Sequence, residues 1–378
     1  MKHFITMIIA FLLLLTTGCS AHNDIYIVWN GGKARISGAK SKVNVTTDKG
    51  GLVRMSVKGK HKGLRIHLSG KGEGQFIFTP IDDSEVILEG LTLHCDTSYA
   101  IVFKGKSTAS ITLSDGSTNT LSDEGIKTKG NLCISGYGML DITCTANGHK
   151  GMRIGGNLYI YGSPKLCVTT SGNPEKMEEM KAPTDMKMPQ NVVPPHPLVV
   201  DSAKHPRMPQ GVPVPSFVRY NYSGTSKGVK VSGSAYMSGG SLRITTHTPG
   251  AEGLETKDSL FVSGGNIHVE AYDDAISVGL KMIVSGGTVY AVSQKSDGID
   301  INGGLKRMGG GGPIDMMRAT EQRGNDPMQT MRCMMQNREP TYIQTGGTVT
   351  CRTLTGPPEE ALDTDDVPIL HTGGTLNR

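Results

Sequence analysis

The sequence is poor in the residues that mark several common protein classes. Aromatic residues make up only 5% of its 378 residues. No amphipathic segment has a convincing helical length, and no apolar run beyond the N-terminal region is long enough to cross a membrane. The net charge is only +5, and no dense run of Lys and Arg is interleaved with aromatics. These features argue against an α-helical protein, a polytopic membrane protein and a nucleic-acid binder.

The usual signatures of a catalytic or metal centre are also missing. The seven cysteines include no CxxC pair and no His partners at zinc spacing, so we interpret them mainly as small packing residues. No Ser/His/Asp or Cys/His set stands in a suitable context, and the glycine run at 309–312 lacks the lysine of a phosphate-binding loop. We therefore expect a protein that is not an enzyme.

The N-terminal region has the features of a secretion signal. Residues 4–15 are almost wholly apolar, follow a short basic start and precede Gly18-Cys19. Such a segment is too short to span a bilayer and is typical of a signal peptide. Gly-Cys behind it resembles a bacterial lipobox, although Thr16 stands where Leu is usual. We predict a signal peptide over 1–18, lipidation of Cys19, and a place in the cell envelope (outer membrane or cell surface). Cleavage to a soluble secreted protein is the alternative.

Glycine is abundant, and it marks an internal repeat. The chain has 50 glycines, which recur between short runs rich in Val, Ile and Leu. A small residue followed by an aliphatic one recurs, and the uninterrupted spacings are 22 to 26 residues. In most units an aliphatic residue or Met stands nine positions later, and a glycine turn follows it. The small residues are Gly125, Gly151, Gly228, Gly253, Ala275, Gly298 and Ala361.

Repeat units of this size predict an all-β fold built as a parallel β-helix. One unit cannot bury its own apolar face, so successive units stack and share a core. A β-propeller would need blades of roughly 40 residues. We predict an N-terminal β segment over 19–79 that caps the solenoid, and the β-helix itself over 80–378. Proline-rich residues 173–222 and methionine-rich residues 308–340 are predicted to be loop insertions.

The stacking turns the alignment into a map of the surface. Two outward columns each run through all seven units. Both change sign, from mainly basic to mainly acidic, between the units that begin at Gly228 and Gly253. The column two residues after the small residue reads Lys127, Arg153, Lys230, Glu255, Ser277, Asp300 and Asp363. The column just before the small residue reads Glu124, Lys150, Lys227, Glu252, Asp274, Asp297 and Glu360.

The acidic half of these columns predicts a calcium site. Stacked like charges repel each other, and a bound cation relieves that repulsion. Many carboxylates without His or Cys favour Ca²⁺ over zinc or copper. A solvated acidic edge that keeps the protein soluble is the alternative. The candidate ligands are Glu252, Glu255, Asp273, Asp274, Asp297, Asp300, Asp363 and Asp365.

The remaining columns predict contacts with carbohydrate. The basic side chains Lys127, Arg153 and Lys230 suit a polyanionic chain such as a uronate polymer. A third column, eight residues after the small residue, contains Tyr159, Tyr236 and Phe261, and aromatic rings can pack against the C–H faces of sugars. The alternatives are plain charge balance for the basic column and burial of the rings under the insertion at 173–222.

Several of these segments resemble a known family. ITLSDGSTNTL at 111–121, GIKTKGNL at 125–132, the repeated Ser/Gly-Gly turns, DGID at 297–300 and GPPEEALD at 356–363 are similar to bacterial carbohydrate-binding right-handed parallel β-helix proteins. Characterised members bind cellulose-like and pectic polysaccharides and carry calcium. The resemblance covers roughly 80–305 and 341–378. It implies a right-handed parallel β-helix that binds polysaccharide without catalysis, with calcium above all at Asp297 and Asp300. Ala275 stands where glycine is usual, which puts one metal site in doubt.

We therefore predict non-catalytic, calcium-assisted binding of a plant cell-wall type or uronate-containing polysaccharide at the bacterial cell surface. The lipid anchor would attach the protein to the membrane, and no nucleic-acid partner is expected. One alternative is a polysaccharide lyase, since this architecture hosts lyases and fold alone does not separate the two functions. Lys230 beside Glu252 and Glu255 would then abstract the proton. The other alternative is a structural stalk or adhesin that binds a protein through its insertions.

Overall fold

The computed structural model describes residues 23–179, 220–302 and 341–378, apart from positions 60, 62, 82, 97 and 366. Within these ranges the regular structure is all strand except for the short 3-10 helix η1 (Lys40–Lys42), so the predicted all-β class is confirmed. No helix in the described ranges is long and apolar enough to cross a membrane. The predicted signal peptide and Cys19 lie outside the described residues.

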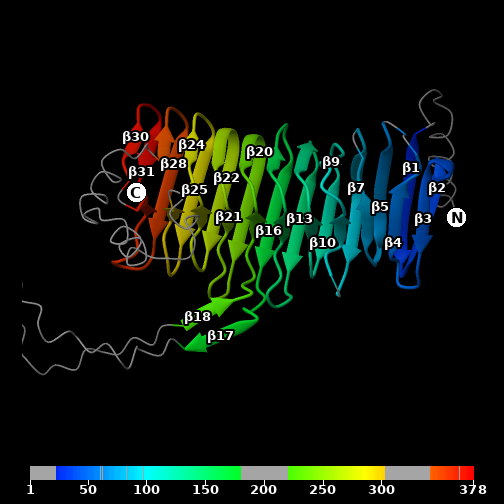
Figure 1. Ribbon diagram of the computed structural model, residues 1–378, viewed down its shortest axis with the longest axis horizontal. Helices are drawn as coiled ribbons and strands as arrows, with labels where there is room; N and C mark the ends of the chain where they lie inside the picture. Colours follow the sequence, from blue (N-terminus) through cyan, green and yellow to red (C-terminus); the bar gives the residue numbers. More distant parts are fainter. Residues whose placement is uncertain are drawn as a thin grey trace, which may run out of the picture.

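Most strands belong to two large sheets, which run side by side along the long axis of the molecule (Figure 1). The 11-stranded sheet contains β3 (Val43–Thr47), β4 (Val53–Val57), β6 (Phe76–Thr79), β8 (Ile101–Phe103), β11 (Ile126–Thr128), β14 (Met152–Ile154), β19 (Val229–Val231), β21 (Leu254–Thr256), β23 (Ile276–Val278), β26 (Ile299–Ile301) and β29 (Leu362–Asp363). We call it the smaller sheet.

The 18-stranded sheet is called the larger sheet. It contains β1 (Asp24–Gly31), β2 (Lys33–Gly38), β5 (Arg65–Glu73), β7 (Glu85–His94), β9 (Ala109–Leu113), β10 (Thr118–Ser122), β12 (Leu132–Gly136), β13 (Met139–Cys144), β15 (Leu158–Ile160), β16 (Lys165–Thr170), β20 (Ala235–Thr246), β22 (Leu260–Ala271), β24 (Met282–Val284), β25 (Thr288–Ser293), β27 (Tyr342–Gln344), β28 (Thr348–Thr353), β30 (Ile369–His371) and β31 (Thr375–Asn377).

Successive repeat units pair in parallel, and the register is the one that the sequence alignment predicts. In the smaller sheet Ile126 pairs with Met152, and Met152 pairs with Val229. The next pair in the series joins Val229 to Leu254. Insertions between units therefore do not disturb the pairing, because Met152 and Val229 are adjacent in space although 173–222 separates them in sequence.

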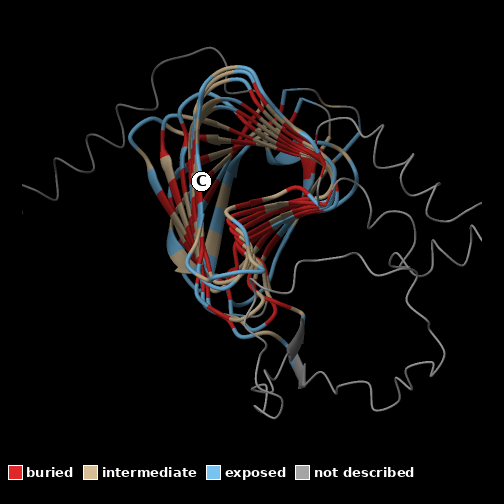
Figure 2. Cartoon of the chain, turned by 90° about the vertical axis from the view of Figure 1, so that its left-hand side faces the viewer, coloured by how far each residue is buried: buried red, intermediate tan, exposed pale blue. Residues whose placement is uncertain are grey.

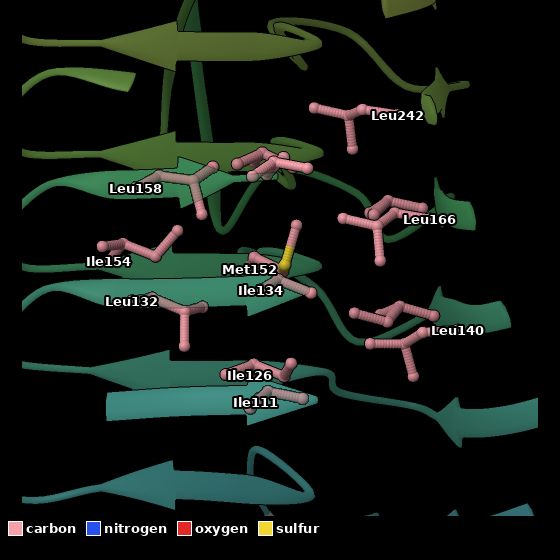
Figure 3. Close-up of a cluster of buried hydrophobic side chains, with 14 of the residues drawn as sticks. Ile111, Ile126, Leu132, Ile134, Leu140, Met152, Ile154, Leu158, Leu166 and Leu242 are labelled. Carbon is pink, nitrogen blue, oxygen red and sulfur yellow. The ribbon is translucent and has the colours of Figure 1, made fainter. Parts of the chain in front are cut away.

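The core lies inside the stacked units, and strand alternation fills it. Most three-residue strands of these units bury their first and third residues and expose the middle one partly, as in β11 and β15. Figure 2 shows the buried residues lining the interior and the exposed ones outside. Figure 3 shows Ile126, Ile154, Leu158 and Leu166 in one such cluster. Each fully buried aliphatic side chain contributes about 1.5–3 kcal/mol, so the stack gains stability from every unit added.

The predicted right-handed parallel β-helix solenoid is corrected by the pairing of the larger sheet. Its parallel pairings close a ring of eight strands, in the order β7, β9, β12, β15, β20, β16, β13, β10 and back to β7, and the other strands are attached to this ring. The ring closes because β7 and β20 are long strands, and each pairs with two separate series of strands. The prediction failed because the glycines were interpreted as breaks between strands, whereas β20 and β22 continue through them.

The predicted insertion at 173–222 has regular structure at both of its ends. β17 (Lys176–Glu179) pairs antiparallel with β18 (Tyr220–Ser223), and this pair projects away from the stack in Figure 1. The expectation of a purely irregular loop is therefore wrong at these ends. Residues 180–219, and the predicted insertion at 308–340, lie outside the described residues.

Glycine at the start of each unit is explained by close stacking. A Cβ on Gly228 would overlap Cγ2 of Ile244 and lie 2.8 Å from the backbone oxygen of Gly253. A Cβ on Gly253 would overlap Cγ1 of Val269 in the same way. Ala275 is tolerated in the next unit because the residue paired with Val269 there is Ala291, which is also small.

We expect Gly228→Ala to destabilise the fold by about 1–3 kcal/mol, because overpacking a filled core displaces its neighbours. Thermal denaturation followed by circular dichroism measures the effect. Gly356→Ala is the matched control, because a Cβ on Gly356 meets no atom within 4 Å. The double variant Gly228→Ala/Ile244→Ala should lose less stability than the sum of the two single variants. Strict additivity would contradict the packing explanation.

Candidate functional site

An outward apolar column runs along the larger sheet and includes the three predicted aromatic residues. Tyr159 pairs with Tyr236, and Tyr236 pairs with Phe261. The ring centroids are 4.9 and 4.8 Å apart, and the planes differ by only 7° and 2°. The side chains are half-buried. We call the whole column the apolar stripe: Cys133, Tyr159, Tyr236, Phe261, Ile283, Ile343 and Leu370.

The stacking changes what these rings can offer to a ligand. Near-parallel rings at this separation turn their faces toward each other. The stripe therefore presents mainly ring edges and phenol hydroxyls, with only part of each face. Asn157 donates a hydrogen bond from Nδ2 to the Tyr159 hydroxyl at 3.1 Å, which holds one ring in position. The aromatic part of the stripe is therefore a row of ring edges and not of open ring faces.

The predicted basic residues lie on the smaller sheet. Lys127 pairs with Arg153, and Arg153 pairs with Lys230, so the predicted column is confirmed. Only the turn at 155–157 separates Arg153 on β14 from the start of β15. Because the chain bends there, the basic column and the apolar stripe form two neighbouring surfaces. The structure does not bring the six predicted carbohydrate contacts into one site.

On the basic surface, Lys230 forms an ion pair with Glu255, whereas Lys127, Lys150 and Arg153 form none with a carboxylate of the described residues. Arg153 is exposed, and Lys127 Nζ lies 5.4 Å from the centre of the Tyr99 ring in a cation–π contact. Lys150 Nζ donates to the backbone oxygen of Gly148 at 2.5 Å. Burial lowers the pKa of Lys150, and the nearby Lys230, Arg153 and Lys227 lower it further. This surface is therefore suited to an anionic group.

A buried ion-pair cluster occupies the point where the columns change sign. Lys227 Nζ lies 2.8 Å from Glu252 Oε1 and 2.8 Å from Glu255 Oε2. Lys230 Nζ lies 3.1 Å from Glu255 Oε2, and Lys257 also pairs with Glu255. Burial raises the pKa of Glu255, but the lysines outweigh it and the pKa falls to about 2. The three lysines neutralise Glu255, whereas at Glu252 burial outweighs the contact with Lys227 and raises the pKa to about 7.

The same cluster weakens the lyase alternative. Proton abstraction requires an unprotonated amine that is free to reach the substrate. Lys230, the base considered from the sequence, is held in an ion pair with Glu255. At Lys227, burial lowers the pKa, but Glu252 and Glu255 outweigh burial and the pKa is raised. Both amines are thus placed as partners of carboxylates.

The remaining acidic residues form a ladder in which carboxylates lie close to one another. Burial raises the pKa of Asp273 and that of Asp297 to about 6, and the neighbouring Asp274 adds to both shifts. Asp300 pairs with Asp363 in the smaller sheet, as the alignment predicts. Ordinary acids in water ionise near pH 4. The two raised pKa values therefore indicate that negative charge is costly at this corner.

The carboxylates do not form a metal cage in this arrangement. Among the described residues, no group of three or more His, Cys, Asp or Glu side chains could hold a metal ion. Protein donors occupy several of the predicted ligands. Asp297 Oδ1 accepts a hydrogen bond from the backbone N–H of Glu360 at 2.6 Å, and Asp300 Oδ2 accepts one from the side-chain Nδ2 of Asn302 at 2.7 Å. Asp363 Oδ1 accepts one from the backbone of Asp365 at 2.8 Å. The predicted residues thus do not fit a calcium cage here, and calcium stays a prediction.

Besides the stacked pair of Tyr26 and His67, sequence reasoning missed the aromatic pair of His268 and Tyr290. Their rings stack with centroids 4.6 Å apart. They lie on the second strand of each unit, whose outward column was not included in the surface map. The signal was present, because His268 and Tyr290 occupy equivalent positions in the repeat.

Comparisons with known proteins give a family match and a weak similarity to a solved structure. Residues 49–174 and 220–366 match the model of a family described as "Carbohydrate-binding domain-containing protein". The family match begins at residue 49, whereas the resemblance noted in the sequence begins at roughly residue 80. A solved structure, the polysaccharide lyase-like protein from C. thermocellum (gadolinium derivative), is similar with 17% identity and a TM-score of 0.44. The similarity covers 74% of this chain and 92% of that one. No curated protein matches significantly.

We expect the free energy of unfolding to increase when the pH falls from 7 to 5. A carboxyl group whose pKa is raised by folding destabilises the folded state once it ionises, and the raised pKa values of Asp273 and Asp297 place this loss between about pH 4 and pH 6. The lowered pKa of Glu255 acts in the opposite direction only below about pH 4.5.

Asp273→Asn should raise the melting temperature by a few degrees at pH 7 and flatten its pH dependence. Differential scanning calorimetry at both pH values measures this, with Asp115→Asn at an exposed position as the control. A lower melting temperature for the Asp273→Asn variant than for the wild type at pH 7 would show that this carboxylate stabilises the fold instead.

Proposed function

Because this chain belongs to the carbohydrate-binding domain-containing protein family, we propose that it binds polysaccharide without cleaving it, as an extended chain that lies along the apolar stripe. The observation that carries the proposal is the register of the stripe, which presents one outward side chain per repeat unit. Paired strands are about 4.8 Å apart, a spacing close to the length of one sugar in an extended glycan. Successive sugars would then meet equivalent side chains.

The neighbouring basic column supports an acidic polysaccharide, such as a uronate polymer, as the ligand. Lys127, Lys150 and Arg153 concentrate positive charge on and next to β11 and β14, and the turn at 155–157 connects β14 to the stripe. A carboxylate on the sugar would relieve the repulsion that lowers the pKa of Lys150. Arg153 can bind a carboxylate with two parallel hydrogen bonds. The chain would contact the stripe with its rings and the basic column with its charged groups.

Calcium assistance and anchoring at the cell envelope are the remaining parts of the proposal. A cation at Asp273, Asp274 and Asp297 would neutralise the charge that raises two of their pKa values. Because the described carboxylates form a ladder and no cage, such binding would require side chains to rearrange or the glycan to supply oxygens. The anchor would be the lipidated Cys19, which lies outside the described residues.

Affinity electrophoresis in gels that contain polygalacturonate or a β-glucan tests the stripe. We expect the wild-type protein to be retarded, and Tyr236→Ala to lower affinity roughly tenfold, because it interrupts a three-ring stack at its centre. Tyr137→Ala is the control, since Tyr137 is exposed and lies outside the stripe. Repeating each gel with calcium and with chelator tests calcium assistance. Equal mobility of wild type in all gels would reject polysaccharide binding for these ligands.

The basic column has its own test. Arg153→Ala should weaken binding to polygalacturonate several-fold and leave binding to a neutral β-glucan unchanged, because only the first ligand carries carboxylates. The difference in polygalacturonate affinity between the wild type and Arg153→Ala should become smaller as salt is added. A loss of equal size for both polymers would mean that Arg153 acts on the structure of the surface and not on ligand charge.

A further inference from the structure

The N-terminal end of the stack carries a groove between its last two strands. β2 pairs antiparallel with β1, and β3 pairs antiparallel with β4, and both pairs lie at this end of the molecule (Figure 1). The helix η1 connects β2 to β3. The groove between them has a volume of about 580 Å³, and we call it the end groove. Its lining includes Ala34, Ile36, Val43, Val45, Lys40 and Lys58.

The apolar part of the end groove is the last layer of the core. Ala34, Ile36 and Val45 pack against the core and are half-buried, and Val43 is fully buried. Strand alternation places the first two on the inner face of β2. The core is therefore partly open to solvent at this end. A partner that covers this apolar surface gains free energy from its burial.

The same end of the molecule is strongly basic. Residues 33–58 contain seven Lys and Arg but a single carboxylate, Asp48, although the net charge of the whole chain is only +5. Asp48 pairs with Arg54 at 2.7 Å, and Asp24 on β1 pairs with Arg65 at 2.7 Å. The exposed cations that pair with no carboxylate of the described residues are Lys33, Arg35, Lys40, Lys49 and Lys58.

Two of these cations belong to the end groove itself. Lys40 is the first residue of η1. The backbone N–H of Lys58 donates a hydrogen bond to the backbone oxygen of Lys42 at 2.8 Å, which places Lys58 beside that helix. Apolar side chains and unpaired ammonium groups thus line one groove. Such a lining complements a molecule that has an apolar part and an anionic head.

The position of the groove favours a membrane lipid over a glycan. An extended polysaccharide needs equivalent side chains over many repeat units, as in the apolar stripe, whereas the end groove lies between only the last strand of each sheet. A membrane that contains anionic lipids presents a flat, negatively charged surface. Each Lys or Arg close to that surface strengthens the attraction.

We propose that the N-terminal end of the stack docks on a membrane. Lys40 and Lys58 contact anionic phospholipid headgroups, and the apolar lining of the end groove contacts the adjoining apolar part of a lipid. This inference deepens the anchoring part of the proposed function. Only residues 20–22 separate the predicted lipidation site, Cys19, from Asn23, the first described residue. Three residues span at most about 11 Å, so a lipid on Cys19 would hold this end at the membrane.

The docking would add a second membrane contact to the predicted lipid. A lipid anchor combined with a basic surface binds membranes more firmly than either one alone. With this end on the membrane, the long axis of the stack points away from the lipid surface (Figure 1). The apolar stripe, which crosses successive repeat units along that axis, then remains accessible to a polysaccharide.

Co-sedimentation with vesicles tests the docking in the absence of the anchor. The protein used is residues 20–378, which contain every described residue and lack Cys19. We expect it to bind vesicles of phosphatidylcholine with phosphatidylglycerol, to bind pure phosphatidylcholine much less, and to lose affinity as salt is added. Lys40→Glu/Lys58→Glu should lower the partition coefficient on the anionic vesicles at least roughly tenfold.

Two further variants make the test specific. Lys33→Glu/Arg35→Glu, on the outer face of β2, should also weaken binding to the anionic vesicles. Lys165→Glu/Lys295→Glu is the matched control, because it changes the net charge equally at two exposed positions farther along the stack. It should leave the partition coefficient within about twofold of the wild-type value. Circular dichroism melting confirms that each variant is folded.

The outcomes separate this inference from polysaccharide binding. Equal losses in Lys40→Glu/Lys58→Glu and in the control would show that only net charge matters, and would overturn the docking. Absence of wild-type binding to anionic vesicles would also overturn it. So would a variant at Lys40 and Lys58 that loses affinity for polygalacturonate gels and keeps its affinity for vesicles, since the groove would then be a glycan site.

None of these results touches the apolar stripe, which the gels test separately. Wild-type protein that binds anionic vesicles through Lys40 and Lys58 but binds no polymer would support the docking and reject polysaccharide binding for the polymers used. Mass spectrometry of the N-terminal peptide from the native host tests lipidation of Cys19. An unmodified Cys19 would reject the anchor, and the vesicle result would still decide whether this end binds lipid.

Discussion

Parallel pairing of repeat units in a single register is the constraint on which every surface of this protein depends. In the corner column, Gly228 donates its backbone N–H to the oxygen of Glu252, and Gly253 donates to Asp274. A slip of one residue in any unit would turn its apolar side chains outward and its charged ones inward. Glycine or alanine at the start of each unit permits the close approach that this pairing needs. The small residues therefore help to fix the register, and the register decides which side chains lie on the surface.

The same register places chemically equivalent side chains above one another, and the energetic consequence depends on their type. Aromatic rings gain from such stacking, as Tyr159, Tyr236 and Phe261 do. Carboxylates lose from it, which is visible in the raised pKa values of Asp273 and Asp297. Between the basic and acidic halves of the columns, Lys227 forms ion pairs with both Glu252 and Glu255. The basic column and the acidic ladder lie on either side of that cluster.

The repeat could be located from the sequence because small residues and aliphatic residues recur at constant offsets. Lys127, Arg153 and Lys230 were placed in one column on that basis, and the strand pairing confirms it. The closed ring of the larger sheet could not be foreseen, because a Gly-Gly pair permits either a break or a bend within one strand, and β20 and β22 bend. The insertion at 173–222 was misjudged at its ends, where β17 and β18 pair across a long sequence separation.

For the candidate site, the sequence alone determined which side chains share a column, since that follows from periodicity and from the alternation of strand faces. Only the tertiary structure decided how the columns relate to one another. It separated the basic column from the apolar stripe across the turn at 155–157, and paired Glu255 with three lysines where a metal site was predicted. It also stacked His268 on Tyr290. The reason is physical: register follows from local pattern, whereas contacts across corners depend on bend angles and side-chain reach, which emerge only when the sheets close.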